Sequence, residues 1–158
     1  GIVSVFDLLY KDFSQKLLAF KDQVKHKSKY ESENIIRTLL EDILRDSSYN
    51  GLKIGEQVLL RNLFLDLKKL DDKERRYINN RASVDFVLYH KLDKSPVIAI
   101  EVDGFAFHEN NPKQIERDQL KDRIFEKYGL PLLRLPTTGS GEERKIREKL
   151  NQILQIDQ

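Results

Sequence analysis

The 158-residue sequence contains no cysteine, no methionine and no tryptophan. Without cysteine, the chain can form neither a disulfide nor a thiolate zinc site, and it has no cysteine nucleophile. The absence of cysteine fits a reducing compartment, and the N-terminal residues lack the charged, apolar and small-residue regions of a signal peptide. We therefore expect a cytoplasmic protein.

Long apolar runs and a strong excess of one charge are also absent. No run reaches the roughly 18 apolar residues that a membrane-spanning helix needs, so we expect no membrane partner. The 28 Lys and Arg nearly balance the 26 Asp and Glu, so any basic surface for nucleic acid must be local. Because position 1 is not methionine, we expect the chain to be a processed piece of a larger parent protein.

Apolar residues at helical spacing predict two separate helices near the N-terminus. The first covers residues 2–25 and forms an N-terminal helical extension at 1–30. The polar stretch 26–29 is expected to separate it from a second helix that begins near Ser32. This start would place Glu33 in the first turn, where the helix dipole favours a carboxylate.

The remaining residues predict strands that alternate with helices. Strand-like apolar runs occur at four places: 55–60, 82–89, 96–102 and 132–135. Helices are expected over 113–128, with a stop at Gly129, and again up to Leu154. The polar segment 71–76 is expected to be mobile. This order predicts one α/β domain at 31–158, with a mixed sheet between helices.

Three carboxylates lie on the two most apolar of these strands. Residues i and i+2 of a strand point to the same face, so Glu101 and Asp103 project together. Asp85 lies within the neighbouring strand, where a buried carboxylate is costly unless it is paired or binds an ion. Hard oxygen ligands without cysteine suit Mg²⁺ or Mn²⁺. The pattern therefore favours a divalent cation between these residues.

Each carboxylate also has a purely structural interpretation. Asp85 can form an ion pair with Arg81 or Lys91. Asp103 and Gly104 can simply form a turn where the strand ends. Both alternatives stay open for each residue taken alone, and they are weaker for the three carboxylates as a set.

The helix predicted over 113–128 carries cations on its apolar stripe. At about 100° per residue, Arg117 and Lys121 lie on this inward stripe and Asp118 lies at its edge. Inward cations need a partner, which the carboxylates can supply; alternatively, both side chains extend to the surface along apolar neighbours. His108, just after the strand, is either a general acid or base or an exposed loop residue.

In this order, the residues resemble the PD-(D/E)XK nuclease superfamily, above all its very-short-patch-repair endonuclease branch and related helicase-associated domains. The segments that carry the resemblance are "VDFVL", "IEVDGFAFH" and "ERDQLKDRIFEKYGLPLLRL". The resemblance covers about residues 31–136. It implies a restriction-endonuclease-like three-layer sandwich, with a central mixed sheet flanked by helices.

The resemblance also implies an activity and partners. The chain would be a metal-dependent DNA endonuclease domain that uses Mg²⁺ or Mn²⁺. It would belong to a larger DNA-processing or DNA-repair protein, such as a helicase fusion, and it could act as a homodimer. In this superfamily pattern Asp85 and Glu101 bind the metal with the Val102 carbonyl, while His108 moves protons and Asp118 orients it.

The resemblance assigns supporting roles to further residues and has one departure. Glu33 and Asp118 correspond to supporting acidic positions, and Gln57 to a polar position that lines such sites. The superfamily usually has a lysine two residues after the Glu, where this chain has Asp103. Lys121 could supply the cation from the following helix, so activity or its loss depends on Asp103 and Lys121.

Phosphate contacts would come from local cations of the chain, namely Lys113, Arg117, Arg123 and Arg134. Two other functions remain open at this point. The domain could bind nucleic acid with a nuclease fold that has lost turnover, as Asp103 in the lysine position favours. It could also be a protein-interaction module that docks through the amphipathic residues 2–25.

Overall fold

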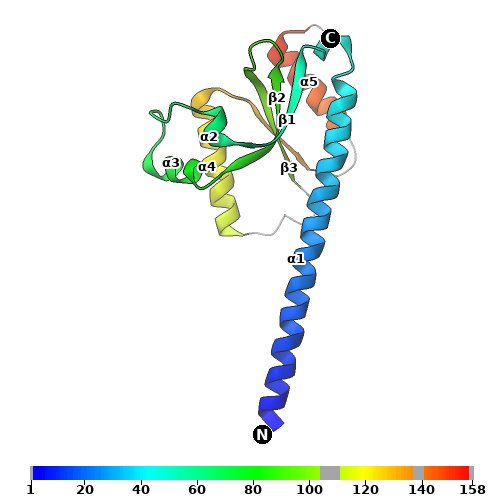
Figure 1. The fold of residues 1–158 in the computed structure, drawn as a ribbon, viewed down its shortest axis with the longest axis vertical. Helices are drawn as coiled ribbons and strands as arrows, with labels where there is room; N and C mark the ends of the chain where they lie inside the picture. Colours follow the sequence, from blue (N-terminus) through cyan, green and yellow to red (C-terminus); the bar gives the residue numbers. More distant parts are fainter. Residues whose placement is uncertain (1, 104–110, 137–140, 157–158) are drawn as a thin grey trace.

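Two adjacent apolar segments of the sequence form the centre of a four-stranded mixed sheet (Figure 1). The computed structural model describes residues 2–103, 111–136 and 141–156. Its strands are ordered β1 (Leu52–Leu59), β2 (Ser83–His90), β3 (Pro96–Asp103) and β4 (Leu132–Pro136). The pairs β1–β2 and β2–β3 are antiparallel, and the pair β3–β4 is parallel. The four predicted strands and their mixed sheet are confirmed.

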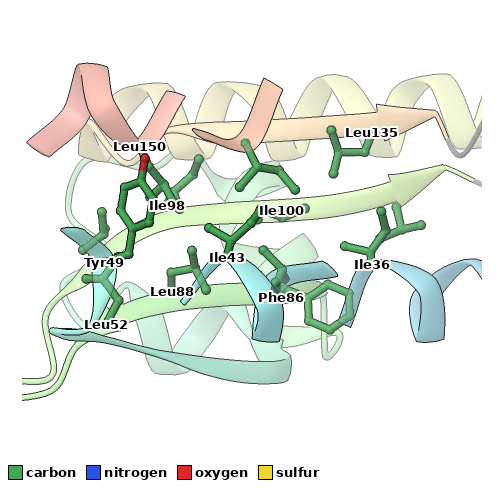
Figure 2. Close-up of a cluster of buried hydrophobic side chains, with 14 residues drawn as sticks. Ile36, Ile43, Tyr49, Leu52, Phe86, Leu88, Ile98, Ile100, Leu135 and Leu150 are labelled. Atoms are coloured by element: carbon green, nitrogen blue, oxygen red, sulfur yellow. The ribbon is translucent and has the colours of Figure 1, made fainter. Parts of the chain in front are cut away.

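Helices cover both faces of this sheet, and each face has its own apolar core. One face carries α1 (Ile2–Ile43) and α5 (Glu142–Leu154), and the other carries α2 (Leu60–Leu63), α3 (Asp72–Asn79) and α4 (Pro112–Tyr128). Successive strand residues point to opposite faces, so Leu88 joins the first core and Val87 the second. Figure 2 shows the first core, in which Ile36 and Ile43 of α1 pack against the sheet. The short 3₁₀ helix η1 (Ser47–Tyr49) follows α1 and adds Tyr49 to this core.

One continuous helix, α1, replaces the two helices predicted near the N-terminus. The expected break at 26–29 is wrong, because the helix runs through it without interruption. The reason lies in the composition: residues 2–43 contain no glycine and no proline, and lysine and glutamate are good helix formers. Glu33 therefore lies inside a long helix and not in a first turn. The N-terminal half of α1 projects away from the sheet (Figure 1).

The segment predicted to be mobile, 71–76, instead begins the helix α3. The Asp71 side chain accepts a hydrogen bond of 2.8 Å from the Glu74 N–H, and the Glu74 side chain accepts one of 2.9 Å from the Asp71 N–H. This reciprocal pair is a capping box, and the spacing of an N-cap residue three positions before a glutamate indicates it in sequence. Glu74 is fully buried and pairs with Lys127, which joins α3 to α4.

Helix α4 matches its prediction closely and ends at Gly129, as expected. Gly129 has a φ of 67°, in the left-handed region that residues other than glycine rarely adopt. The chain then turns directly into β4, next to β3. Within the residues that the structure describes, no helix has the length and apolar character needed to cross a membrane.

Replacing Gly129 tests this helix end. A Cβ at Gly129 meets no atom within 4 Å, so Gly129→Ala should destabilise the fold through backbone strain alone, by about 1–2 kcal/mol. Gly51→Ala is the matched control, because Gly51 has equally open space and no left-handed φ. Urea unfolding should show a loss for Gly129→Ala and none for Gly51→Ala. Equal stability of the two variants would contradict the assignment.

Candidate active site

A cavity of about 330 Å³ lies where β2 and β3 carry their carboxylates. Side chains from five elements supply its charged lining: Lys29, Asp85, Glu101, Asp103, Asp118, Lys121 and Arg134. Four of these side chains are acidic and three are basic. The fold therefore gathers residues more than 100 positions apart in the sequence around one polar space.

Asp85 sits at the point where the ladder between β2 and β3 stops. The paired residues end with Phe86 and Ile100. Beyond them, Asp85 Oδ2 accepts a 2.8 Å hydrogen bond from the Val102 N–H. The Asp85 carboxylate thus accepts a hydrogen bond that a strand carbonyl would otherwise accept. This bond offsets part of the cost of burying Asp85, which is only 3% exposed.

Gln57 contacts Asp85 from the other neighbouring strand. The β1–β2 pairing continues on both sides of Gln57, with Glu56 opposite Phe86 and Val58 opposite Val84. Gln57 itself has a φ of 47°, a conformation that costs a non-glycine residue about 1–3 kcal/mol and tends to occur at functional sites. Its Nε2 donates to Asp85 Oδ1 at 3.4 Å, so a polar group from each flank holds this carboxylate.

Glu101 is paired with Lys121, which reaches it from α4. The Lys121 ammonium donates to Glu101 Oε1 and, at 2.8 Å, to the Ser83 carbonyl. Glu101 is 8% exposed and Lys121 is 9% exposed. The predicted inward direction of Lys121, toward the carboxylates, is confirmed. The same prediction for Arg117 is wrong, because Arg117 is exposed.

Lys29 is a second cation near the carboxylates. Its Nζ lies 3.9 Å from both Asp85 Oδ1 and Glu33 Oε1. Within the described part of the chain, Lys29 is thus the cation paired with Asp85, in place of the predicted Arg81 or Lys91. Burial and the nearby Asp85 raise the pKa of Glu33 above its usual value.

The cavity holds Glu101 in an environment that favours its protonated form. Burial raises the pKa of the Glu101 carboxyl to about 7, against its ordinary 4.5. Lys121 lowers this pKa and Asp85 raises it, and burial outweighs the attraction of Lys121. A carboxyl with a pKa near neutrality can exchange protons under physiological conditions, and a further cation beside it would favour the ionised form.

Asp118 and Arg134 form the other side of the cavity. Arg134 Nη1 lies 3.6 Å from Asp118 Oδ1, and Gln114 Nε2 donates to the same oxygen at 3.0 Å. Arg134 also bonds Asp122 at 2.9 Å. Asp103, partly buried, lines the cavity two residues after Glu101, on the same face of β3.

Some predicted site residues lie elsewhere. Lys113 and Arg117 are exposed on the first half of α4. Arg123 faces away from the cavity, 3.8 Å from Glu74 of α3. His108, together with Gly104, lies outside the described residues, so its proposed part in proton transfer remains a prediction.

Lys29 is the residue that sequence reasoning missed. A signal for it existed, because Lys29 and Glu33 are four positions apart and such pairs face each other on a helix. The predicted helix break at 26–29 put Lys29 outside the second helix, so this pairing with Glu33 was not recognised. Whether this helix face meets Asp85 depends on how α1 crosses the sheet, which local spacing does not encode.

Comparison with protein-family models places the chain in a family. A model for DUF2726, described as a protein of unknown function, matches residues 25–153. The chain belongs to the DUF2726 family. A search of curated proteins and a search of solved structures each found no match. The DUF2726 match contains every residue of the cavity and leaves out the projecting residues 2–24 of α1.

The cavity of this DUF2726 chain offers oxygen donors that fit a hard divalent cation. Asp85 and Glu101 are buried carboxyl groups from adjacent strands, and the N–H of Val102, the residue after Glu101, donates to Asp85. Among the residues described, no group of three or more His, Cys, Asp or Glu is arranged to hold a metal. Mg²⁺ commonly uses only one or two carboxylates and keeps several waters. The donor set therefore fits an ion such as Mg²⁺ and not a structural zinc.

The raised pKa of Glu101 makes stability depend on pH. Above pH 4.5 the folded state holds this proton more tightly than the unfolded state, so stability should fall as pH rises toward 7. The loss is at most about 3 kcal/mol. Glu101→Gln should flatten this dependence when urea unfolding is measured at about pH 5 and pH 8.

The slope with pH, and not the absolute stability, is the quantity to compare. Glu33 contributes in the same direction, so the variant keeps part of the slope. Identical slopes for the wild type and Glu101→Gln would show that Glu101 titrates normally.

Proposed function

We propose that this cavity is the active site of a metal-dependent endonuclease domain that hydrolyses DNA phosphodiester bonds. The observation that carries the proposal is the convergence of Asp85, Glu101 and Lys121 in one cavity. The mixed sheet with helices on both faces supports a restriction-endonuclease-like sandwich, which the sequence resemblance implies. In this proposal the domain belongs to a larger DNA-processing protein, such as a helicase fusion.

Asp85, Glu101 and the Val102 carbonyl would hold Mg²⁺ or Mn²⁺. Such an ion, when bound, polarises a phosphate and lowers the pKa of a water molecule. The chain's own contribution is to fix the ligands in advance. The Val102 N–H and Gln57 hold Asp85, while Lys121 holds Glu101, so little ordering is left for the moment of binding.

Lys121 would supply the positive charge that the superfamily takes from a lysine on the strand. That position is Asp103 in this chain. Lys121 reaches the same glutamate from α4 and stays in hydrogen-bond contact with Glu101. A cation held beside the reacting phosphate stabilises negative charge that develops in the transition state. Asp103 is then an additional carboxylate of the cavity.

The charge of the cavity supports a requirement for an added cation. Its lining carries four carboxyl groups and three basic side chains, so a phosphate alone meets no net positive charge. A divalent ion reverses that balance. Lys113 and Arg117, exposed on the first half of α4, would then contact backbone phosphates farther along the strand.

A second function is favoured by the lysines themselves. Lys121 and Lys29 already neutralise Glu101 and Asp85 from within the chain. Asp103 also replaces the usual lysine. A domain of this kind could bind nucleic acid, or a protein partner, without hydrolysing anything. DNA binding that weakens with salt, without cleavage, would favour this alternative.

Hydrolysis assays on plasmid and single-stranded DNA in Mg²⁺ or Mn²⁺ test the proposal. Asp85→Ala, Glu101→Ala and Lys121→Met should each lower the cleavage rate by about a hundredfold or more, because each removes a metal ligand or charge stabilisation. Glu126→Ala is the matched control. It removes an exposed carboxylate on α4 outside the cavity and should leave the rate unchanged.

Equal cleavage by the wild type and the three cavity variants would indicate a contaminating nuclease and overturn the proposal. Circular dichroism should accompany each assay, since Asp85, Glu101 and Lys121 are buried. Glu101→Gln, which keeps the shape of the side chain, serves as a second variant if Glu101→Ala does not fold.

Titration calorimetry with Mg²⁺ and Mn²⁺ tests the metal site separately. Asp85→Ala should abolish binding. Lys29→Met should tighten it severalfold, because it removes a positive charge 3.9 Å from Asp85 that repels an incoming cation. Weaker binding by Lys29→Met would mean that Lys29 organises the site instead of competing with the metal.

A further inference from the structure

The projecting half of α1 exposes a row of large apolar side chains. Five of them are between 43% and 75% exposed: Phe6, Tyr10, Phe13, Leu17 and Phe20. This part of the helix points away from the sheet (Figure 1). Apolar rows of this size on a soluble chain mark surfaces that another molecule covers.

The spacing of these five residues is that of a coiled-coil helix. The steps from Phe6 to Phe20 are four, three, four and three residues, which places all five at the a and d positions of a heptad. A helix with this pattern packs best against another helix of the same kind. The spacing thus points to a helical partner and not to a flat surface.

We propose that the partner is α1 of a second copy of this chain, running antiparallel. In that arrangement Phe13 meets Leu17 of the second copy, and Tyr10 meets its Phe20. The flanking positions then bring Asp7 next to Lys21 of the second copy, twice by symmetry. Opposite charges at such positions select partner and orientation.

The parallel arrangement would bring like charges together. It would place Lys16 next to Lys21 of the second copy, twice. In the antiparallel pair Lys16 lies next to Lys16 of the second copy, once, and the 3.0 Å ion pair between Lys16 and Asp12 of the same helix is present in either arrangement. The charge pattern therefore favours the antiparallel pair.

The size and shape of the molecule suit this pairing. An aromatic side chain buries about 150–250 Å² when covered. The four aromatic residues of each helix are 62–75% exposed, so the eight of the pair can bury about 800–1,300 Å², close to the ~1,200 Å² of the smallest stable interfaces. Because the N-terminal half of α1 extends beyond the sheet (Figure 1), antiparallel helices place the two folded bodies at opposite ends of the pair.

Sedimentation equilibrium of the whole chain tests the association. We expect a mass of twice 18.6 kDa at micromolar to tens-of-micromolar concentration. Phe13→Glu and Phe20→Glu should each give a monomer. Leu18→Glu is the matched control, because Leu18 and Phe20 are both 62% exposed but Leu18 lies outside the a and d positions. A monomer at about 200 μM, or equal disruption by Leu18→Glu, would overturn the proposal.

The orientation has its own test, helped by the absence of cysteine. Ser14→Cys places the chain's one thiol beside its symmetry mate in the antiparallel pair, so oxidation should yield a cross-linked dimer. In a parallel pair the two thiols lie on opposite sides and should not cross-link. Lys21→Asp should weaken the antiparallel dimer, and adding Asp7→Lys should restore it. A dimer that Lys21→Asp strengthens would be parallel and would contradict the proposal.

Discussion

The ion pair between Lys121 and Glu101 ties α4 to the middle of the sheet. The Lys121 ammonium also donates to the Ser83 carbonyl. One side chain therefore contacts both β2 and β3, near the point where these two strands stop pairing. Removing one member of a buried pair typically costs about 3–5 kcal/mol, because the other charge is left uncompensated. The pair therefore lets the chain keep the Glu101 carboxyl group in its interior.

The opening of the sheet beside this pair gives the cavity its polar character. Where β2 and β3 stop pairing, Asp85 takes over a backbone hydrogen bond, and Gln57 on β1 adopts a left-handed conformation beside it. These departures from regular strand geometry lie at the cavity, which supports a functional interpretation of it.

Much of the fold could be predicted because apolar periodicity dominates it. The strands, α4 and the stop at Gly129 follow from local patterns, as does the inward side chain of Lys121. The errors came from treating polarity as a sign of irregular structure. The stretch 26–29 is helical because nothing in it breaks a helix, and 71–76 is ordered by a capping box and the buried Glu74.

The sequence by itself determined the elements and the carboxylates of the candidate site, since strand alternation alone puts Glu101 and Asp103 on one face. Only the tertiary structure decided what surrounds them. Lys29 meets Asp85 because α1 crosses the sheet at that point, and Arg117 stays exposed although it is four residues from Lys121. The physical reason is that local spacing fixes the direction of a side chain along its own element. The residues that surround a side chain depend on how separate elements pack against one another. Burial of apolar residues on both faces of the sheet governs that packing.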